Sequence, residues 1–486
     1  MEKKDLKPAG VFKYFEEICQ VPRPSKKEEK MIAYLKAFGT KHNLETKVDE
    51  SGNVLIKKPA TPGKENLQTV VLQSHIDMVC EKNNNVQHDF LTDPIETEID
   101  GEWLKAKGTT LGADNGIGVA TELAILADDS IEHGPLECLF TVDEETGLTG
   151  AFALKEGFMS GDILLNLDSE DEGEIFIGCA GGIDSVAEFE YKDVEVPAGY
   201  YFFKVEVKGL KGGHSGADIH LGRGNANKIL NRFLSRMAAR QDLYLCEING
   251  GNLRNAIPRE AYAVCAVPEA AKHDVRTELN IFISEIENEL AVIEPDLELI
   301  LESESPRSTA IDQNTTSRLL KAIYAVPHGV YAMSQDIPGL VETSTNLASI
   351  KMKPNHIIRI ETSQRSSILS ARNDMANTVR AVFQLAGAIV TFGEGYPGWK
   401  PNPHSAILEV ATESYKRLFG VEAKVKAIHA GLECGLFLDK YPNLDMVSFG
   451  PTLIGVHSPD ERMLIPTVEK FWKHLLDILV HVPAKK

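Results

Sequence analysis

Residues 69–77 read TVVLQSHID, a short apolar and β-branched run that ends in polar side chains. Such a run predicts a buried strand whose last residues meet a site. Residues two apart on a strand face the same side, so His75 and Asp77 can share one pocket. An aspartate that accepts a hydrogen bond from an imidazole is the arrangement that orients a metal-bound histidine. Taken alone, a His-x-Asp pattern is more often ordinary surface or core polarity.

The segments on either side of this strand alternate between strand and helix patterns. Two more apolar strands are predicted at 136–142 and 162–168. A hairpin around Asp100-Gly101 is predicted at 95–105, and a short apolar helix at 117–126. Strands that alternate with helices are typical of an α/β layered domain. The chain has 486 residues, which is too long for one ordinary core, so two or more domains are expected.

The character of the sequence changes near Ala187. Alternating strand patterns at 201–208 and 357–362 are each followed by a helix pattern, at 225–240 and 375–389. Both helices contain an Ala-Asn pair, Ala226-Asn227 and Ala376-Asn377, which suggests two similar strand-turn-helix halves.

A stretch rich in proline and glycine, residues 393–403, predicts a linker, and the helices and strand that follow it can complete the first domain. We therefore predict an α/β fold with a discontinuous domain, a mixed sheet flanked by helices, at 1–186 and 398–486. An α+β domain at 187–397 is predicted to be inserted into it.

The composition excludes several classes of protein. Hydrophobic residues make up 43% and charged residues 25% of the chain, which are ordinary globular values. A net charge of −20 would be repelled by phosphate backbones, so we expect no nucleic-acid partner. No apolar stretch follows Met1 and no run approaches a membrane span, so a cytoplasmic protein without a membrane partner is expected. The seven scattered cysteines are typical of reduced thiols.

A glycine-flanked aspartate precedes the helix pattern at 117–126. The segment reads Gly112-Ala113-Asp114-Asn115-Gly116. One interpretation is that Asp114 or Asn115 caps the helix. The other is that Asp114 bridges two metal ions while the glycines let the backbone come close to them. From this motif alone, capping is the stronger interpretation.

Three successive acids end the strand pattern at 136–142, in the segment Thr141-Val142-Asp143-Glu144-Glu145-Thr146-Gly147. Clustered carboxylates repel one another unless a cation neutralises them. A solvated acidic loop and a metal site explain this segment about equally well, although the apolar run before it favours a site.

Two more candidates lie at Asp168, after the apolar strand ILLN, and at His457, in a loop. Each signal is modest, but together they provide nitrogen and oxygen ligands without thiolates. That ligand set suits zinc, manganese or cobalt in a catalytic site.

In these motifs the chain resembles the dizinc metallopeptidases that include aminoacylase, glutamate carboxypeptidase and peptidase T, and within them the Xaa-His dipeptidases. The similarity runs end to end through LQSHIDMV, GTTLGADNGIGVA, TVDEETGLTGA, NLDSE, GGHSG and GVHSPDE. The resemblance implies hydrolysis of small dipeptides, including β-alanyl-histidine, by attack of a metal-bridging hydroxide. It also implies two divalent ions per chain, with zinc expected and manganese or cobalt as alternatives, and a homodimer.

The resemblance also assigns roles to individual residues. Glu144 would be the general base and Asp77 would orient His75. One metal would be held by His75, Asp114 and Asp168, and the other by Asp114, Glu145 and His457.

The inserted domain would correspond to the family's lid. His214, in KGGHSG, would approach the active site, which in dimeric members belongs to the partner subunit. Asn255 and Gly431 would contact substrate, and Arg365 would pair with the substrate carboxylate, with Arg359 and Arg372 as nearby alternatives. Glu433 would lie near the free amine of the substrate or make a loop hydrogen bond. A related acylase or tripeptidase and a non-catalytic binding protein remain the rival interpretations.

Overall fold

The computed structural model describes residues 3–485. The chain divides into two compact units. The first comprises Met1–Gly178, Pro401–Ala427 and Leu432–Lys486, and the second comprises Cys179–Lys400 and Ile428–Gly431. The segment 428–431 belongs to the second unit because the Ala180 amide donates to the carbonyls of Ile428 and Ala430.

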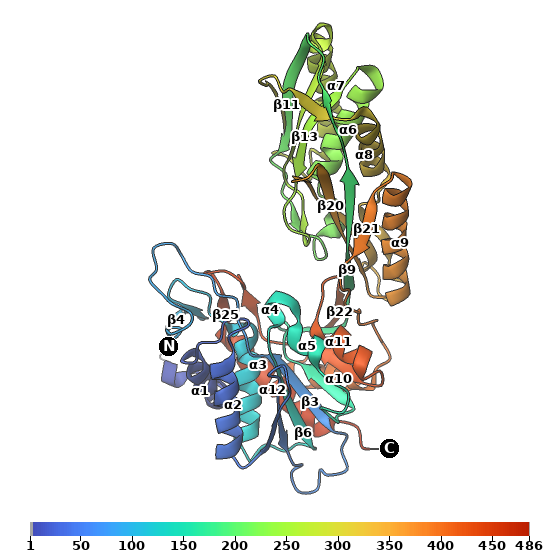
Figure 1. Cartoon of the computed structure of the whole chain (residues 1–486). Coiled ribbons are helices and arrows are strands. Elements are labelled where there is room, and N and C mark those ends of the chain that lie inside the picture. The colour runs from blue at the N-terminus through green and yellow to red at the C-terminus, as the bar shows by residue number, and fades with distance from the viewer. Residues whose placement is uncertain (1–2, 486) are drawn as a thin grey trace. The chain divides into compact units, whose positions relative to one another are not determined.

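The first unit contains an eight-stranded mixed sheet in the order β1-β2-β6-β3-β7-β23-β8-β22. Its strands β3, β6 and β22 are labelled in Figure 1. The central strands β6, β3, β7 and β23 run parallel, while β1, β2 and β8 pair in antiparallel fashion. The strands are β1 (Glu45–Val48), β2 (Val54–Lys58), β3 (Val70–His75), β6 (Leu136–Thr141), β7 (Ile163–Asn166), β8 (Glu174–Cys179), β22 (Lys424–Ile428) and β23 (Asp445–Ser448).

A second, four-stranded sheet in this unit has the order β24-β25-β5-β4. Its β4–β5 hairpin turns at the predicted Asp100-Gly101, where Gly101 has a positive φ of 62°. Its strands are β4 (Thr97–Asp100), β5 (Trp103–Ala106), β24 (Leu453–Ile454) and β25 (Arg462–Leu464).

Helices flank the large sheet of the first unit. Helix α3 packs against β3 and α1, and α10 packs against β23 and α12. All residues of α3 from Asn115 to Leu126 are buried, which is typical of a helix enclosed in a core. The helices are η1 (Lys3–Asp5), α1 (Ala9–Cys19), α2 (Glu29–Lys41), α3 (Ala113–Ala127), α4 (Glu144–Gly147), α5 (Thr149–Ala153), α10 (Ala406–Phe419), α11 (Glu433–Lys440) and α12 (Ile465–His481). The predicted α/β fold with a mixed sheet between helices is confirmed for this unit.

The second unit contains a nine-stranded sheet whose main path is β16-β11-β15-β13-β19-β20-β9-β21, with β18 also paired to β19. Its strands are β9 (Gly181–Glu190), β11 (Tyr200–Lys208), β13 (Tyr244–Gly250), β15 (Ala261–Pro268), β16 (Glu298–Ser303), β18 (Gly329–Met333), β19 (Val341–Lys353), β20 (Ile357–Ser366) and β21 (Ile389–Phe392). Two short ribbons pair β10 (Asp193–Glu195) with β17 (Thr309–Ile311) and β12 (Gly213–His214) with β14 (Ala256–Ile257).

The helices of the second unit are η2 (Ile219–Leu221), α6 (Ala226–Arg240), η3 (Glu269–Ala271), α7 (Lys272–Leu290), α8 (Gln313–Ala325) and α9 (Leu369–Leu385). Together with the sheet they bury one large apolar core, which includes Phe203, Phe233, Phe282 and Phe383.

The sheet of the second unit is built from two halves of the same topology. In chain order, one half runs β11-α6-β13-β15-α7-β16 and the other runs β9-α8-β19-β20-α9-β21. If the four strands of each half are numbered in chain order, both halves have the spatial order 4-1-3-2. The second strands of the two halves, β13 in one and β19 in the other, pair with each other at the centre of the sheet. The two halves suggested by the sequence therefore exist. However, α6 corresponds to α8, so the Ala-Asn pairs of α6 and α9 do not mark equivalent positions.

The helix predicted at 375–389 begins earlier and ends earlier than expected. Helix α9 stops at Leu385, and Gly387 follows with a positive φ of 81°, a conformation that ends helices. Ile389 lies instead in β21, where it pairs with Glu188 of β9. Among residues 3–485, no helix is long and apolar enough to span a membrane.

Candidate functional site

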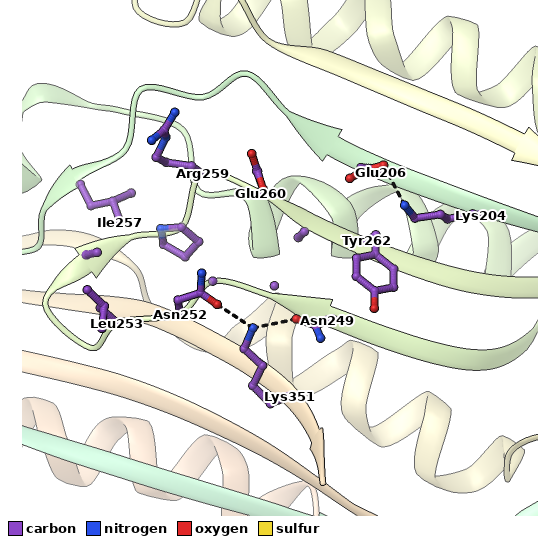
Figure 2. Close-up of a pocket in the computed structure, with 15 residues that line it drawn as sticks. Lys204, Glu206, Asn249, Asn252, Leu253, Ile257, Arg259, Glu260, Tyr262 and Lys351 are labelled. Atoms are coloured by element: carbon purple, nitrogen blue, oxygen red, sulfur yellow. Dashed lines mark hydrogen bonds and ion pairs between the residues drawn. The ribbon is translucent and has the colours of Figure 1, made fainter. Parts of the chain in front are cut away.

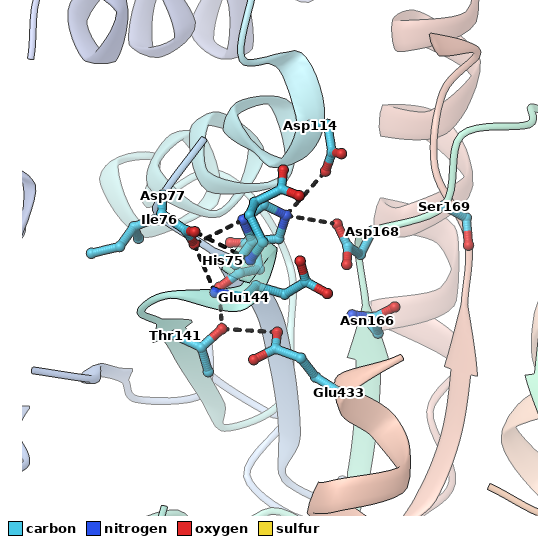
Figure 3. A network of polar contacts seen from close by, with 12 residues as sticks. His75, Ile76, Asp77, Asp114, Thr141, Glu144, Asn166, Asp168, Ser169 and Glu433 are labelled. Carbon is cyan, nitrogen blue, oxygen red and sulfur yellow. Dashed lines mark hydrogen bonds and ion pairs between the residues drawn. The ribbon is translucent and has the colours of Figure 1, made fainter. Parts of the chain in front are cut away.

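The first unit gathers the predicted site residues at the carboxyl edge of three parallel strands. His75 is the last residue of β3, and it lies level with Thr141, the last residue of β6. Asp168 follows β7 by two residues, and Glu144 begins the short helix α4 after β6. Ligand sites of α/β sheets form at this edge because the loops that leave the strands converge there. Figure 3 shows the resulting cluster around His75.

Asp114 lies between two histidines from distant parts of the chain. Its Oδ1 is 3.0 Å from His75 Nε2, and its Oδ2 is 3.1 Å from His457 Nε2. One further carboxylate flanks each histidine. Asp168 Oδ1 is 3.4 Å from His75 Nε2, and Glu145 Oε2 is 2.9 Å from His457 Nε2. The five predicted ligand side chains therefore form two sets that share Asp114.

The pKa values of the clustered acids are lowered by histidines and raised by burial. Although burial opposes it, His457 and His75 lower the pKa of Asp114. Hydrogen bonds to Asp114 and Glu145 raise the pKa of His457 to about 11. Burial raises the pKa of Asp168 to about 6, against the opposing effect of His75. The acids thus require protons or cations close to them.

The donor set fits a pair of divalent cations. Imidazole nitrogens and carboxylate oxygens are ligands that zinc, manganese and cobalt accept. Oε1 of Glu145 is buried without a hydrogen-bond partner, which leaves a lone pair available at the cluster. His75, Asp114 and Glu145 also place one ligand atom each within 4.8 Å of one another. Cations at this position would replace the protons that the metal-free cluster needs.

Asp77 fixes both a histidine and the acidic helix α4. Its Oδ1 lies 3.3 Å from His75 Nδ1 and accepts the Glu144 amide at 3.0 Å, while Oδ2 accepts the Glu145 amide at 3.3 Å. The Ser25 hydroxyl donates to Oδ2 at 2.8 Å. A fully buried carboxylate with these donors holds the imidazole and the start of α4 in one arrangement.

Glu144 lies beside the cluster and is the acid of α4 that is not a predicted metal ligand. Burial raises the pKa of Glu144 well above its ordinary value, and the charges of Asp168, Glu433 and Glu145 add to the effect while His75 opposes it. A carboxyl whose pKa is displaced upward in a polar site is suited to take up and release a proton.

Glu461 is a residue of this site that the sequence analysis missed. Its carboxylate is 2% exposed and accepts hydrogen bonds from four consecutive amides, Leu111 to Asp114, at 2.7, 2.9, 2.8 and 3.3 Å. These amides form the loop that enters α3, so Glu461 holds Asp114 in place. It lies four residues after His457, and this spacing was the only signal of its role.

Arg23 is a second missed residue. Its guanidinium donates to the carbonyls of Ile76 and Asp77 at 3.1 and 2.8 Å and also to the carbonyl of Gly112. It therefore joins the end of β3 to the Asp114 loop. No local motif surrounds Arg23, so its role depends entirely on the fold.

Glu433, at the start of α11, points into the first unit. Its Oε2 accepts from Gln73 Nε2 at 2.7 Å and from Thr141 Oγ1 at 2.9 Å, while its Oε1 is buried without a partner. Burial raises its pKa to about 8, and Asp168 adds to this effect while His75 opposes it. Glu433 therefore accepts hydrogen bonds through Oε2, while its Oε1 can still accept another.

The second unit holds His214 in a closely built turn. Nδ1 of His214 accepts hydrogen bonds from the Gly216 and Ala217 amides at 3.2 and 3.0 Å. The neutral ring therefore carries its proton on Nε2 and can only donate from that atom. Burial and the nearby Arg365 lower its pKa to about 4, so the ring is neutral at physiological pH.

The structure separates the three arginines considered for the substrate carboxylate. Arg359 pairs with Glu361 at 2.9 Å and with Glu188 at 3.6 Å. Arg372 donates to the carbonyls of Gly182 and Tyr396 and to Asn373. Among residues 3–485, Arg365 donates only to hydroxyls, at 2.9 Å to Tyr396 and at 3.4 Å to Ser215.

The other predicted residues of the second unit lie around Arg365. The Asn255 carbonyl accepts the Ser215 amide at 2.7 Å, which joins the His214 turn to the Asn255 loop. Gly431 packs against the Tyr396 ring, where a Cβ would meet Tyr396 Cε2 at 3.0 Å. His214, Asn255, Arg365 and Gly431 therefore gather within one unit.

Residues 71–481 match peptidase family M20/M25/M40, and the chain belongs to this family. The resemblance inferred from the sequence motifs is thus confirmed.

Two relatives cover the whole chain. The cytosol non-specific dipeptidase of Escherichia coli (strain K12) is 46% identical over 484 residues, which is 100% of both chains. The crystal structure of aminoacylhistidine dipeptidase from Vibrio alginolyticus is 46% identical, covers 100% of this chain and 99% of that one, and has a TM-score of 0.93. Aminopeptidase PepT from Bacillus cereus, 17% identical with a TM-score of 0.61 over 98% of this chain and 99% of that one, shares the fold.

Proposed function

We propose that this protein is a metal-dependent dipeptidase that hydrolyses small dipeptides, including those with a C-terminal histidine. Membership of the peptidase family and the two full-length relatives named as dipeptidases support the reaction class. The observation that carries the proposal is Asp114, whose two oxygens each lie within 3.1 Å of a different histidine.

The ligand sets are proposed as two triads that share one carboxylate. His75, Asp114 and Asp168 would hold one ion, and Asp114, Glu145 and His457 would hold the other. Two divalent ions bring a charge of +4, and these three acids bring −3. When bound, such ions polarise the scissile carbonyl and make a water molecule acidic enough to attack near neutral pH.

Other side chains of the first unit are proposed to orient a ligand and to transfer the proton. Asp77 orients His75 and the start of α4, which places Glu144 at the edge of the ligand cluster. Glu144 accepts the proton of the attacking water and then delivers it to the leaving amine.

Residues of the second unit are proposed to bind the substrate. His214 donates from Nε2 to the oxyanion that develops on the scissile carbonyl. One such donor is typically worth about 3–4 kcal/mol of barrier. Arg365 pairs with the C-terminal carboxylate, and Asn255 and Gly431 contact the backbone of the dipeptide. A longer peptide would lack the carboxylate at this position and would leave Arg365 buried without a counter-charge, so dipeptides are preferred.

The finer properties are proposals of the same kind. Zinc is the expected metal, with manganese and cobalt compatible with the same ligands. A cytosolic location follows from the Escherichia coli relative, which is named a cytosol dipeptidase. A homodimer is proposed from the family resemblance, and light scattering of the purified protein tests it. A monodisperse monomer would contradict it.

The central experiment is metal analysis combined with a substrate panel. We expect two divalent ions per chain by mass spectrometry and hydrolysis of β-alanyl-histidine and other dipeptides. A chelator should abolish this hydrolysis, and added zinc should restore it. Tripeptides and N-acyl amino acids test the rival activities, and a preference for either would contradict the dipeptidase assignment.

A further inference from the structure

The second unit contains a cavity of about 300 Å³ around Arg365. Its walls come from four segments of the sequence: the start of β9, the loop before β14, β20, and the segment after β21. Ile183, Asn255 and Tyr396 contribute to these walls. The cavity is formed by residues of this unit alone.

Arg365 requires an anion in this cavity. The residue is 7% exposed, and the ion pairs of residues 3–485 give it no carboxylate partner. Its hydrogen-bond partners among the described residues are the hydroxyls of Ser215 and Tyr396, which leave part of the guanidinium fork available. A buried charge without a counter-ion is costly, and a carboxylate is the group that a guanidinium binds in bidentate fashion.

Two carboxylates line the same cavity as Arg365. Asp184 pairs with Arg254 at 2.6 Å, so its charge is balanced. Glu394 is exposed, and it has no ion-pair partner among the described residues. The cavity therefore offers a buried cation and, toward solvent, one unbalanced anion. A ligand that matches both carries a carboxylate together with a cationic or N–H donating group.

A larger cavity of about 440 Å³ in the same unit lacks this property (Figure 2). There Lys351 donates to the side-chain oxygens of Asn249 and Asn252 at 2.8 and 2.9 Å, and Lys204 pairs with Glu206 at 2.9 Å. The lysines of this larger cavity already have polar partners. The smaller cavity is therefore the one with a buried cation that has no carboxylate partner.

We propose that the cavity at Arg365 holds the C-terminal residue of the dipeptide and that Glu394 makes it selective for basic and imidazole side chains. This inference rests on the proposed function, in which Arg365 binds the C-terminal carboxylate. Lysine and histidine present a positive charge or a ring N–H to Glu394. A C-terminal glutamate would place like charges together, which is unfavourable.

The test compares kcat/KM for alanyl-lysine, alanyl-histidine, alanyl-glutamine and alanyl-glutamate. The wild type should prefer lysine and histidine to glutamine, and glutamine to glutamate. In Glu394→Gln, the preference for lysine over glutamine should fall about threefold, since a partly exposed ion pair contributes modestly. Glu394→Lys should reverse the order of lysine and glutamate.

The control is Glu190→Gln, which removes the same charge from the exposed end of β9, outside the cavity. It should leave all four ratios unchanged. An unchanged lysine-to-glutamine ratio in Glu394→Gln would overturn the inference.

Two further measurements distinguish a wrong role for Glu394 in selectivity from a wrong role for Arg365 in the proposed function. Arg365→Ala should raise KM for all four dipeptides without changing their order, and an unchanged KM would contradict the carboxylate role of Arg365. Calorimetric binding of free lysine and glutamine to wild type and Glu394→Gln tests the cavity without turnover. Equal affinities for the two amino acids in the wild type would also overturn the selectivity.

Discussion

At the scale of the residue, the site depends on carboxylates whose neighbours give them different tasks. Asp114, Glu145 and Asp168 face the Nε2 atoms of histidines, Asp77 faces His75 Nδ1 and backbone amides, and Glu144 faces mainly other acids. Under the proposed function, the same side-chain chemistry would serve ligation, orientation and proton transfer, because each carboxylate has different partners.

Glu144→Gln should strongly lower turnover and leave the metals bound. The amide keeps the shape of the side chain but cannot accept the proton, and general-base catalysis contributes about 100- to 10,000-fold. Steady-state kinetics with β-alanyl-histidine and metal analysis of the same sample measure both properties. Glu156→Gln, at an exposed acid of the same unit, is the control. Activity near wild type in the metal-loaded variant would contradict the assigned role.

His457→Ala should lower the affinity for one of the two ions. The variant removes one nitrogen beside Asp114 and Glu145 and leaves the His75 set intact. Titration with a competing chelator should show one tight and one weakened site per chain. His481→Ala, at the exposed end of α12, should bind both ions as the wild type does. Two tight sites in His457→Ala would count against the ligand assignment.

At the scale of the element, the site depends on loops that other segments hold in place. The non-helical start of α3 carries Asp114, and the Glu461 carboxylate and the Arg23 guanidinium bind the backbone around it from opposite ends of the sequence. The turn of His214 is fixed in a comparable way by the ribbon of β12 with β14. Functional side chains in both units are therefore positioned by hydrogen bonds to backbone rather than by helix or strand geometry alone.

Glu461→Gln should weaken metal binding although Glu461 contacts no proposed metal position. The new amide group would turn N–H donors toward backbone amides that also donate, at a cost of about 1–3 kcal/mol. Thermal unfolding and metal titration should both shift, whereas Glu469→Gln, at a half-buried glutamate of α12 that pairs with Lys473, should leave metal affinity unchanged. Unaltered metal affinity in Glu461→Gln would show that the loop keeps Asp114 in place by itself.

At the scale of the whole molecule, buried histidines make stability depend on pH in both units. Burial lowers the pKa of His474 in the first unit to about 4 and that of His429 in the second unit to about 3, from an ordinary value of 6.5. The unfolded chain therefore binds more protons than the folded chain below about pH 6.5. Each such histidine lowers the free energy of unfolding as the pH falls from about 6.5 toward the pKa of the folded state.

His474→Gln should reduce this pH dependence. His474 is 3% exposed and its Nε2 donates to the Ala411 carbonyl at 2.8 Å, an interaction that glutamine can retain. The loss of unfolding free energy between pH 6.5 and 4.5 should be smaller in the variant by up to about 2 kcal/mol. Urea titrations at the two pH values measure it, with the exposed His404→Gln as control. Equal losses in wild type and His474→Gln would refute the assignment.

The sequence by itself determined the local elements and the chemistry of the individual motifs. The apolar run at 69–77 became β3, the Asp100-Gly101 pair became the β4–β5 turn, and Asn225 caps α6 by accepting the Lys228 amide. These features depend on side-chain periodicity, on turn conformation and on hydrogen bonds between near neighbours. All of them are encoded within a few residues.

Only the tertiary structure decided which distant residues act together. It brought His457 to Asp114 and placed Glu461 on the amides of residues 111–114. Among the described residues it also left Arg365, unlike Arg359 and Arg372, with hydroxyl partners but no carboxylate or carbonyl acceptor. It also paired β13 with β19 and thereby made one sheet from two similar halves. Such contacts join segments separated by tens to hundreds of residues, and their geometry depends on the packing of the whole sheet, which no local pattern contains.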